Sequence, residues 1–423
     1  MNDTSSVGGL DRRGFIRLAA AGAALAGGLS TDVAQPSESL ADITRQPNRS
    51  FGDDLNTADI VVETLIAWGA TNVFGVVGDG INSIIEALRK RRDRIRNVGV
   101  RHEEAAAFMA SGHAKHTGQL GVCVGTTGPD AIHLLNDLCD AYFDGAPVVA
   151  LTGITFHDLI GVRYQQGVDT TRVMQDVAVY NVQLTGPEHA VLVANRACRA
   201  ALGDRGVAHL VMAKDVQMMK RSSDKRSMRN PGARSSSSWT PVLSAPALDQ
   251  LRAAADVLNS GKRVAILAGQ GALTARAEVT RLAELLGAPV SKALLGKAVL
   301  PDDSPLTTGG IDDLGTAPSS WAMKVCDTVL ILGSTMPWEE YYPTPGRARG
   351  VQVDLKPDRI GLRYPVEVGL TGDVKATLQG PSPYCTAKRS AAFCRKPSGA
   401  CRTGILCLKR WNPLLAHRCG RRW

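Results

Sequence analysis

Short apolar runs alternate with amphipathic segments along most of the chain. Each run has the length of a buried strand, and the amphipathic segments space their apolar positions for one face of a helix. The predicted strands are residues 72–77, 96–100, 120–125, 147–152, 263–268, 328–333 and 350–354, and the predicted helices are residues 59–68, 84–90, 103–116, 131–141 and 273–286. Continuous apolar strands alternating with helices are typical of a parallel sheet covered on both faces, so the pattern predicts an α/β fold.

Polar segments divide this pattern into two doubly wound domains. Residues 36–54 carry prolines and precede the first helix, and residues 221–240 are rich in Ser, Arg, Gly and Pro. Such a composition is typical of exposed connections rather than of packed elements. We therefore predict one parallel-sheet domain over residues 55–220, a linker over 221–240, and a second parallel-sheet domain over 241–378.

The segment before the first domain has the features of an export signal. Arg12 and Arg13 precede an apolar stretch over residues 18–29 that is rich in Ala and Gly. The stretch is shorter than the roughly 20 apolar residues of a membrane span, so no integral membrane segment is expected. Paired arginines before a short, weakly apolar stretch indicate a twin-arginine signal over residues 1–35 and export to the periplasm. The alternative is a chance apolar helix, in which case the protein is cytoplasmic.

The net charge of +9 belongs to one end of the chain. Residues 380–423 contain ten Lys and Arg and no Asp or Glu, which leaves 39 basic and 40 acidic residues in the rest. A nucleic-acid-binding domain would combine basic and aromatic residues in its folded part, so no nucleic-acid partner is expected. The nine cysteines form no CxxC pair, and their spacing therefore predicts no metal site.

Candidate chemistry lies where the second predicted strand is followed by a helix. Glu103 opens this Ala-rich helix, and Gly125 to Pro129 form a strand-to-helix turn whose backbone can approach a ligand closely. A carboxylate at the start of a helix is by itself explained by the helix dipole. A functional interpretation of Glu103 therefore needs a wider pattern around it.

The residues around Glu103 supply that wider pattern. The runs 73–80, 102–118, 125–129 and 147–153, with His133 and Asn136, closely resemble the pyrimidine-binding domain of thiamine-diphosphate enzymes of the pyruvate oxidase and acetolactate synthase type. The resemblance implies that Glu103 is the catalytic glutamate, whose carboxyl group hydrogen-bonds N1′ of the aminopyrimidine ring and favours the tautomer that activates the coenzyme at C2. It also implies coenzyme contacts from Val77, Gly78, Thr127, Pro129, His133 and Asn136. The neighbouring Glu104 is predicted to be a solvated surface charge.

One short sequence resembles the beginning of the family's magnesium motif. Gly78-Asp79-Gly80 looks like the start of the metal and diphosphate motif, which requires an Asn downstream where this chain has an Ala-rich stretch. We therefore predict a turn at Asp79 and no metal ligand there.

The second predicted domain resembles the family's central domain, which binds FAD in pyruvate oxidase and acetolactate synthase. Gly269 and Gly271 follow a strand and open a helix, as a phosphate cradle does. Thr274 replaces the third glycine of a dinucleotide fingerprint, so an independent NAD site is not expected. FAD is left open, because relatives of this fold often keep the domain without the flavin. If FAD binds, the expected contacts are Gly269, Gly271, Gly333, Ser334 and Asp354.

The family's third domain, with its diphosphate and magnesium motif, has no counterpart in the sequence. After residue 378 the composition changes to a basic, Cys-rich segment over 379–423, which indicates a frameshift or an aberrant gene end, and a basic interaction tail is the alternative. In the family, the coenzyme lies between the first domain of one subunit and the third domain of another, in a homodimer or homotetramer.

The sequence therefore predicts a truncated thiamine-diphosphate-binding protein of the 2-oxo acid decarboxylating type. A typical substrate would be pyruvate, the magnesium site would be missing, and activity would be impaired. The alternative function is that of a non-catalytic remnant that folds and dimerises or binds FAD alone.

Overall fold

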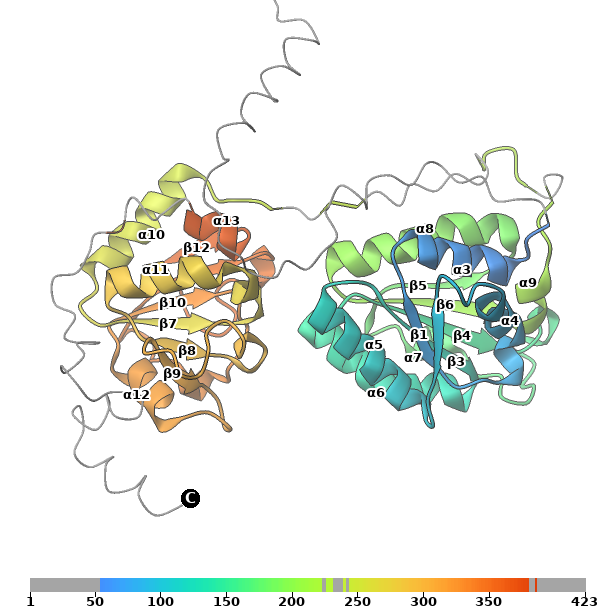
Figure 1. Cartoon of the computed structure of the whole chain (residues 1–423), viewed down its shortest axis with the longest axis horizontal. Coiled ribbons are helices and arrows are strands. Elements are labelled where there is room, and N and C mark those ends of the chain that lie inside the picture. Colours follow the sequence, from blue (N-terminus) through green and yellow to red (C-terminus); the bar gives the residue numbers. More distant parts are fainter. Residues whose placement is uncertain (1–53, 223–225, 231–238, 241–242, 380–384, 386–423) are drawn as a thin grey trace, which may run out of the picture. The chain divides into compact units, whose positions relative to one another are not determined.

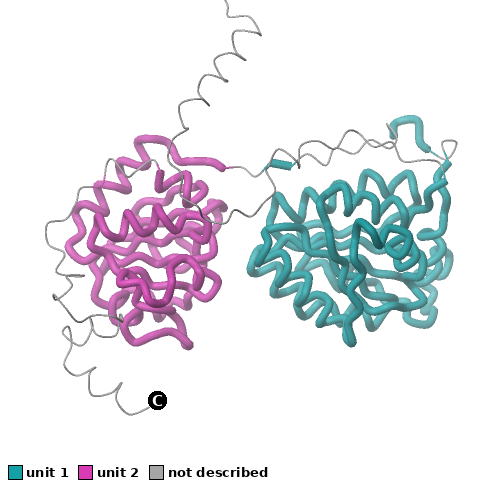
Figure 2. Tube along the Cα trace, viewed as in Figure 1, with its two compact units in different colours: residues 1–240 teal, residues 241–423 magenta. Residues whose placement is uncertain are grey.

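The computed structural model describes residues 54–222, 226–230, 239–240, 243–379 and 385. The chain forms two compact units, residues 1–240 and residues 241–423 (Figures 1 and 2). Each unit has its own central sheet and its own buried core on both faces of that sheet.

The first unit is built on six parallel strands. They are β1 (Asn72–Gly75), β2 (Arg96–Gly99), β3 (Gly121–Thr127), β4 (Val148–Ile154), β5 (Ala178–Leu184) and β6 (Val207–Ala213), in the order β2-β1-β3-β4-β6-β5. The inner strands β4 and β6 are buried along their whole length, which explains why they are apolar without alternation. Because all the strands run in the same direction, the loops that follow them gather at one edge of the sheet, here called the carboxyl edge.

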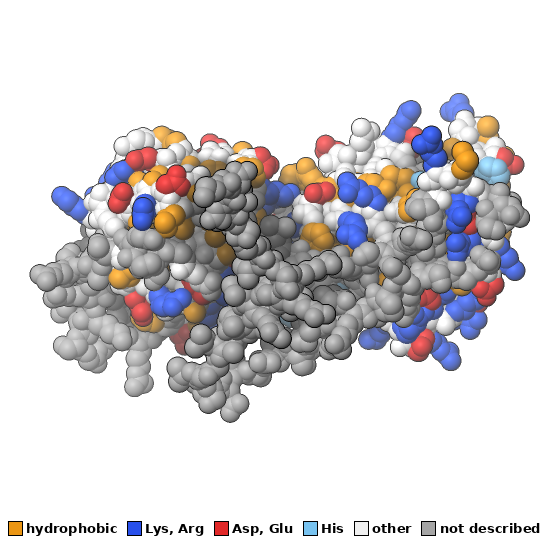
Figure 3. Space-filling view, turned by 90° about the horizontal axis from the view of Figure 1, so that it is seen from above, with side chains coloured by type: hydrophobic (Ala, Val, Ile, Leu, Met, Phe, Trp, Pro, Cys, Tyr) orange, Lys and Arg blue, Asp and Glu red, His pale blue; other side chains and the backbone are white. Residues whose placement is uncertain are grey.

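Helices cover both faces of the first sheet (Figure 1). One face is covered by α5 (Glu103–Thr117), α6 (Pro129–Asp144) and the short α7 (Thr170–Val173), and the other by α3 (Thr57–Ala67), α4 (Asn82–Lys90), α8 (Pro187–Asp204) and α9 (Lys214–Met218). Two 3-10 turns, η1 (Asp79–Ile81) and η2 (His157–Leu159), follow β1 and β4. On the face of the molecule shown in Figure 3, basic and acidic side chains lie interspersed.

The second unit repeats this architecture. Its strands are β7 (Val264–Ala268), β8 (Val290–Lys292), β9 (Thr307–Gly310), β10 (Thr328–Leu332), β11 (Arg349–Asp354) and β12 (Val368–Thr371), all parallel, in the order β12-β11-β10-β7-β8-β9. One face is covered by α10 (Leu248–Ser260), α11 (Arg276–Leu286) and α13 (Val374–Gln379), and the other by α12 (Ala317–Val325). Its 3-10 turns are η4 (Gln270–Ala275), η5 (Leu294–Gly296), η6 (Glu339–Tyr341) and η7 (Pro357–Arg359).

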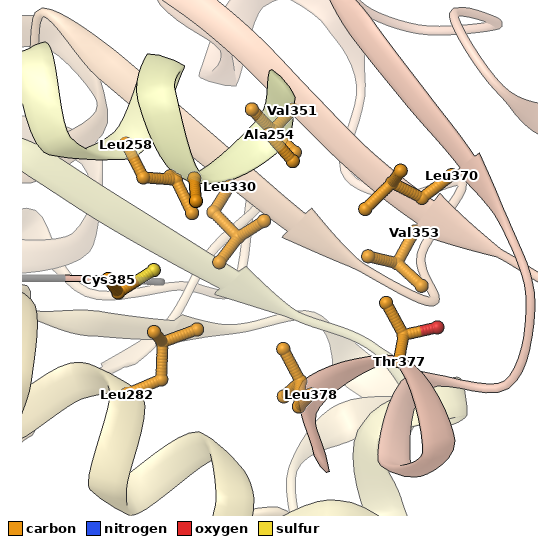
Figure 4. A pocket seen from close by; sticks show the side chains of 11 residues that line it. Ala254, Leu258, Leu282, Leu330, Val351, Val353, Leu370, Thr377, Leu378 and Cys385 are labelled. Carbon is orange, nitrogen blue, oxygen red and sulfur yellow. The ribbon is translucent and has the colours of Figure 1, made fainter. Parts of the chain in front are cut away.

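A small apolar cavity of about 20 Å³ lies between α10, α11, α13 and the second sheet (Figure 4). Leucine, valine and alanine side chains line it, and Thr377 is a polar exception whose hydroxyl oxygen has no hydrogen-bond partner. A water molecule needs at least two polar partners as well as space, so this lining favours a dry packing defect over a ligand site.

The predicted fold class is confirmed, because both units are α/β layers on all-parallel sheets. The predicted export segment over 1–35 lies outside the described residues, and so does the basic tail except for Gln379 and Cys385. Within the described part of the chain, no helix combines the length and the apolar character that crossing a bilayer requires.

Candidate active site at the carboxyl edge of the first sheet

Glu103 is the first residue of α5, just beyond the end of β2. His102 is the N-cap of this helix, with an extended backbone (φ −152°), and its Nδ1 accepts a hydrogen bond from the Glu104 amide at 3.3 Å. Acidic side chains in a first helical turn are stabilised by the helix dipole. The Glu103 side chain is only 9% exposed, so its carboxyl group lies at the carboxyl edge while being largely shielded from water.

The turn before α6 brings a second set of polar groups to this place. Pro129 is the first residue of α6, where its fixed φ and missing N–H are tolerated. Gly128 has φ +69°, and a Cβ atom there would lie 2.8 Å from the carbonyl oxygen of Gln166. Only glycine satisfies both constraints, and the resulting close turn aims the first turns of α6 at Glu103.

The side chains of His102, Glu103 and His133 meet near the N-terminal ends of α5 and α6. His133 Nδ1 lies 2.9 Å from Glu103 Oε2, in hydrogen-bond contact. The His102 ring stacks on the His133 ring, with 4.5 Å between centroids and 27° between planes. The carboxyl group is therefore held by one imidazole, which a second imidazole supports from the side.

Asp130 adds a second carboxyl group. Burial alone would raise the pKa of Glu103, but its hydrogen bonds to His133 and Asp130 outweigh this effect and lower the pKa below its ordinary value. Burial raises the pKa of Asp130, and the charge of Glu103 raises it further. The two carboxyl groups therefore influence each other, and their pKa values shift in opposite directions.

The ends of β1 and β3 form the neighbouring part of the edge. The Gly80 amide donates to the Thr126 hydroxyl at 2.9 Å, which ties the turn after β1 to β3. Val77 precedes this turn and leaves 67% of its surface exposed, while Thr127 is buried. An exposed apolar side chain thus shares the carboxyl edge with the shielded carboxyl group of Glu103.

The structure brings most of the predicted residues of the first unit to one place. Glu103 and His133 are in contact, and Val77, Gly78, Thr127 and Pro129 follow the adjacent strands β1 and β3. Asn136 instead donates a hydrogen bond to Glu104, the residue that follows the predicted catalytic Glu103 on α5. The Glu104 side chain is 39% exposed, in agreement with the predicted surface charge, and it also accepts this hydrogen bond.

Two residues of the cluster were missed by the sequence analysis as functional candidates. Asp130 lies three positions before His133 on α6, and this spacing places both side chains on one helical face. That signal was available in the sequence. The stacking of His102 on His133 had no such signal, because it depends on how α5 and α6 pack.

Asp79 opens the 3-10 turn η1, where a turn was predicted. Asp79 forms an ion pair with Lys214 and accepts a hydrogen bond from Asn82 at 3.0 Å. Its carboxylate is therefore paired within the protein, in agreement with the interpretation of this segment as a turn.

In the second unit, the predicted flavin contacts lie at the ends of three adjacent strands, β7, β10 and β11. The Gly271 amide donates to the Gly333 carbonyl at 3.1 Å, and the Gly269 amide donates to Leu332 at 2.9 Å. A Cβ atom at Gly269 would lie 2.4 Å from the Gly333 carbonyl oxygen. The glycines thus allow two loops to pack backbone against backbone, and these two amides are already engaged within the protein.

Asp354 ends β11 in the same region, and Ser334 follows β10. Asp354 is buried, which raises the pKa of its carboxyl group, and it accepts a hydrogen bond from the Lys356 amide at 3.1 Å. The Ser334 hydroxyl donates to the Met336 carbonyl at 2.7 Å. All five predicted residues therefore lie at the carboxyl edge of the second sheet.

Two family models match the chain. The model for the N-terminal TPP binding domain of thiamine pyrophosphate enzymes matches residues 55–174, and the model for the central domain of these enzymes matches residues 251–380. The first match contains the Glu103 cluster, and the second contains the glycine loops of the second unit.

Individual relatives point in the same direction. The Bacillus subtilis protein YdaP, whose name assigns it thiamine pyrophosphate provisionally, is 36% identical over 333 residues, which cover 79% of this chain and 56% of YdaP. An uncharacterized 42.6 kDa protein of Pseudomonas amyloderamosa is 36% identical over 336 residues, which cover 79% of this chain and 83% of that protein. Pyruvate oxidase of Lactiplantibacillus plantarum is 31% identical over 319 residues, which cover 75% of this chain and 52% of the oxidase. The chain spans about half the length of YdaP and of this pyruvate oxidase.

Proposed function

The chain belongs to the thiamine pyrophosphate enzyme family, and on that premise we propose that its first unit holds the aminopyrimidine ring of thiamine diphosphate against Glu103, in a site for a 2-oxo acid substrate. The observation on which the proposal rests is the Glu103 carboxyl group, 9% exposed at the carboxyl edge and hydrogen-bonded to His133.

The residues present fit this ring. An aminopyrimidine offers ring nitrogens that need a hydrogen-bonding partner and two flat faces that need apolar contacts. Glu103 supplies a carboxyl group shielded from water, where a hydrogen bond is stronger than in bulk solvent. Val77 supplies exposed apolar surface just after the end of the adjacent strand β1. The chain thus offers both kinds of contact at one edge of the sheet.

Thiamine diphosphate, when bound, supplies an electron sink for the carbanion that decarboxylation of a 2-oxo acid produces. The protein's own residues prepare for this chemistry by placing protons. Glu103 would hydrogen-bond the ring nitrogen, His133 orients the Glu103 carboxyl group, and Asp130 places a second carboxyl group beside it. A carboxyl group between two ionisable neighbours can exchange a proton with them rather than with bulk water.

The substrate class and the remaining cofactors are further parts of the proposal. Pyruvate is proposed as a representative 2-oxo acid, because a pyruvate oxidase is among the relatives. FAD in the second unit is supported by the position of its glycine loops beside the buried Asp354. Magnesium, the homo-oligomeric state and impaired turnover stay predictions, which assays of the purified protein with pyruvate and both cofactors can test.

The test compares Glu103→Gln with Glu104→Gln in titrations of thiamine diphosphate and Mg²⁺. Glutamine keeps the size of the side chain but loses the ionised hydrogen-bonding group, which contributes about 1.5–3 kcal/mol, so we expect binding to weaken at least about tenfold. Glu104→Gln changes the adjacent acid on the same helix and should leave the affinity within about twofold. Equal affinity of wild type and Glu103→Gln, with equal thermal stability, would contradict the proposed function.

A further inference from the structure

The cluster that holds Glu103 also has the composition of a metal site. One ligand atom from each of His102, Glu103 and His133 lies within 4.8 Å of the others. Among the described residues, these three side chains form the group of His, Cys, Asp or Glu ligands that could converge on one metal ion. The coenzyme role proposed above uses Glu103 as a hydrogen-bonding group and does not require two imidazoles beside it.

We propose that His102, Glu103 and His133 bind a late first-row divalent cation such as Zn²⁺. Imidazole nitrogens and a carboxylate oxygen are ligands that this class of ion prefers, and two histidines with one glutamate leave a coordination position open. Mg²⁺ is a poor match, because it prefers an octahedron of oxygen ligands.

The required movements are small. Zinc bonds to nitrogen and oxygen are about 2.0–2.2 Å long, which puts two ligands of a tetrahedral ion roughly 3.5 Å apart. Ligand atoms that lie up to 4.8 Å apart must therefore approach by roughly 1 Å, whereas His133 Nδ1 and Glu103 Oε2, which are 2.9 Å apart, must separate slightly. Glu103 is fixed by burial, but the His102 and His133 side chains are 52% and 42% exposed, so their rings can turn without disturbing the core.

The charge balance also favours a cation. The N-terminal ends of α5 and α6 both meet here, and their dipoles disfavour positive charge. The carboxyl groups of Glu103 and Asp130 lie together at this place, and the negative charge that they can carry offsets this effect.

The test is a titration of the full chain with Zn²⁺, and with Co²⁺ as an optical probe. Wild-type protein should bind one equivalent of Zn²⁺. His133→Ala and His102→Ala should each weaken this binding at least about tenfold. The matched control is His157→Ala, which removes another imidazole paired with a carboxylate, that of Asp215, and should leave this equivalent unchanged. Cysteines of the tail are present in every variant, and Co²⁺–thiolate absorption separates them from nitrogen and oxygen ligands.

Loss of the equivalent in the two site variants, with thermal stability of the metal-free proteins unchanged, would support the inference. Zinc binding that is identical in wild type, His102→Ala and His133→Ala would overturn it. So would the absence of any zinc equivalent in the wild type.

The consequence for the coenzyme rests on the proposed function and is tested separately. One carboxylate cannot serve an ion and an aminopyrimidine ring at the same time, so thiamine diphosphate should raise the apparent dissociation constant of Zn²⁺. Zinc binding that ignores thiamine diphosphate would leave the metal site standing and contradict the shared use of Glu103.

Discussion

At the scale of single residues, Asp137 is a buried acid on a helix of the candidate site, and its protonation state affects the stability of the folded protein. It lies on α6 with its side chain buried, and neither carboxyl oxygen has a hydrogen-bond partner. Burial and the charge of Asp140 raise its pKa to about 7, against the opposing influence of Lys115 on α5. Asp144 and the buried thiol of Cys123 also face this position. Asp137 is therefore protonated in the folded protein below about pH 7.

We predict that Asp137→Asn removes a pH-dependent loss of stability. An unfolded Asp titrates near pH 3.9, so the folded state retains a proton that the unfolded state loses, and wild-type stability falls as the pH rises from about 4 to 7. Between pH 5.5 and 8.5 this amounts to about 2 kcal/mol. Buried His209 titrates with the opposite sign in this range, so the informative quantity is the difference between variants. As the pH rises, urea unfolding should show a change in stability about 2 kcal/mol less favourable in wild type and in the exposed control Asp249→Asn than in Asp137→Asn. The same pH dependence in all three proteins would count against a raised pKa.

The residues of the candidate site divide into those that local sequence reveals and those that only packing reveals. Glu103, Gly128 and Pro129 are visible in the sequence, since the positions of a helix start and a tight turn follow from local rules. The contacts of His133 with Glu103 and of His102 with His133 join two helices separated by a strand. No local rule fixes such distances, because they depend on how α5 and α6 pack on β3.

At the scale of elements, His209 links three strands of the first sheet. Its Nε2 lies 2.8 Å from the Thr152 hydroxyl of β4, and its Nδ1 lies 2.8 Å from the Asn181 amide oxygen of β5. The ring is fully buried, and burial lowers its pKa to about 3. The neutral imidazole thus satisfies the buried Thr152 hydroxyl and the amide oxygen of the partly buried Asn181.

We expect His209 to make the first unit sensitive to acid. His209 takes up a proton near pH 6.5 in the unfolded state but stays neutral in the folded state. The stability that the neutral His209 contributes is therefore lost as the pH falls from about 6.5 towards 3. Between pH 7 and 5 the loss is about 2 kcal/mol. His209→Gln should be less stable than wild type at pH 7. From pH 7 to pH 5 its stability should change about 2 kcal/mol more favourably than that of wild type, whereas the exposed control His116→Gln should change as wild type does. Denaturant midpoints that shift equally with pH in all variants would refute this explanation.

The glycine loops of the second unit allow a sharper test of flavin binding than a change at a glycine. Any side chain at Gly271 would meet the Gly333 Cα at 2.9 Å, so such a variant would disturb the loops whether or not FAD binds. We predict that purified protein is yellow and that Asp354→Ala loses the chromophore, while Asp358→Ala, an exposed acid nearby, keeps it. Colourless wild-type protein that takes up no added FAD would contradict the flavin proposal and leave the fold unaffected.

Strand prediction succeeded where burial makes the signal simple. β4, β7 and β10 are buried along their length and were found as continuous apolar runs. The sequence analysis missed β5, β6, β8, β9 and β12. β5 lies at the sheet edge with mixed exposure, and the short β9 consists of Thr and Gly. β6 is the exception, because it is buried along its whole length and its apolar run was present in the sequence. Edge strands and glycine-rich strands acquire their conformation from a neighbouring strand, so their own residues show no clear period.

At the scale of the whole molecule, the export prediction concerns residues outside the described part of the chain. If Arg12 and Arg13 form a twin-arginine signal, the double change Arg12→Lys and Arg13→Lys should retain the protein in the cytoplasm, because such signals depend on the arginine pair. Fractionation of cells that express both forms measures the outcome. Identical distribution of the two forms would show that the segment is not a working signal.

The central claim is that Glu103 contacts the aminopyrimidine ring, and saturation-transfer NMR with thiamine diphosphate tests it most directly. This measurement detects weak binding and reports which ligand protons touch the protein. We predict stronger transfer to the pyrimidine protons than to the thiazolium protons for wild-type protein and Glu104→Gln, and loss of this pattern in Glu103→Gln. A pattern that is unchanged in Glu103→Gln, or strongest at the thiazolium ring in the wild type, would contradict the account.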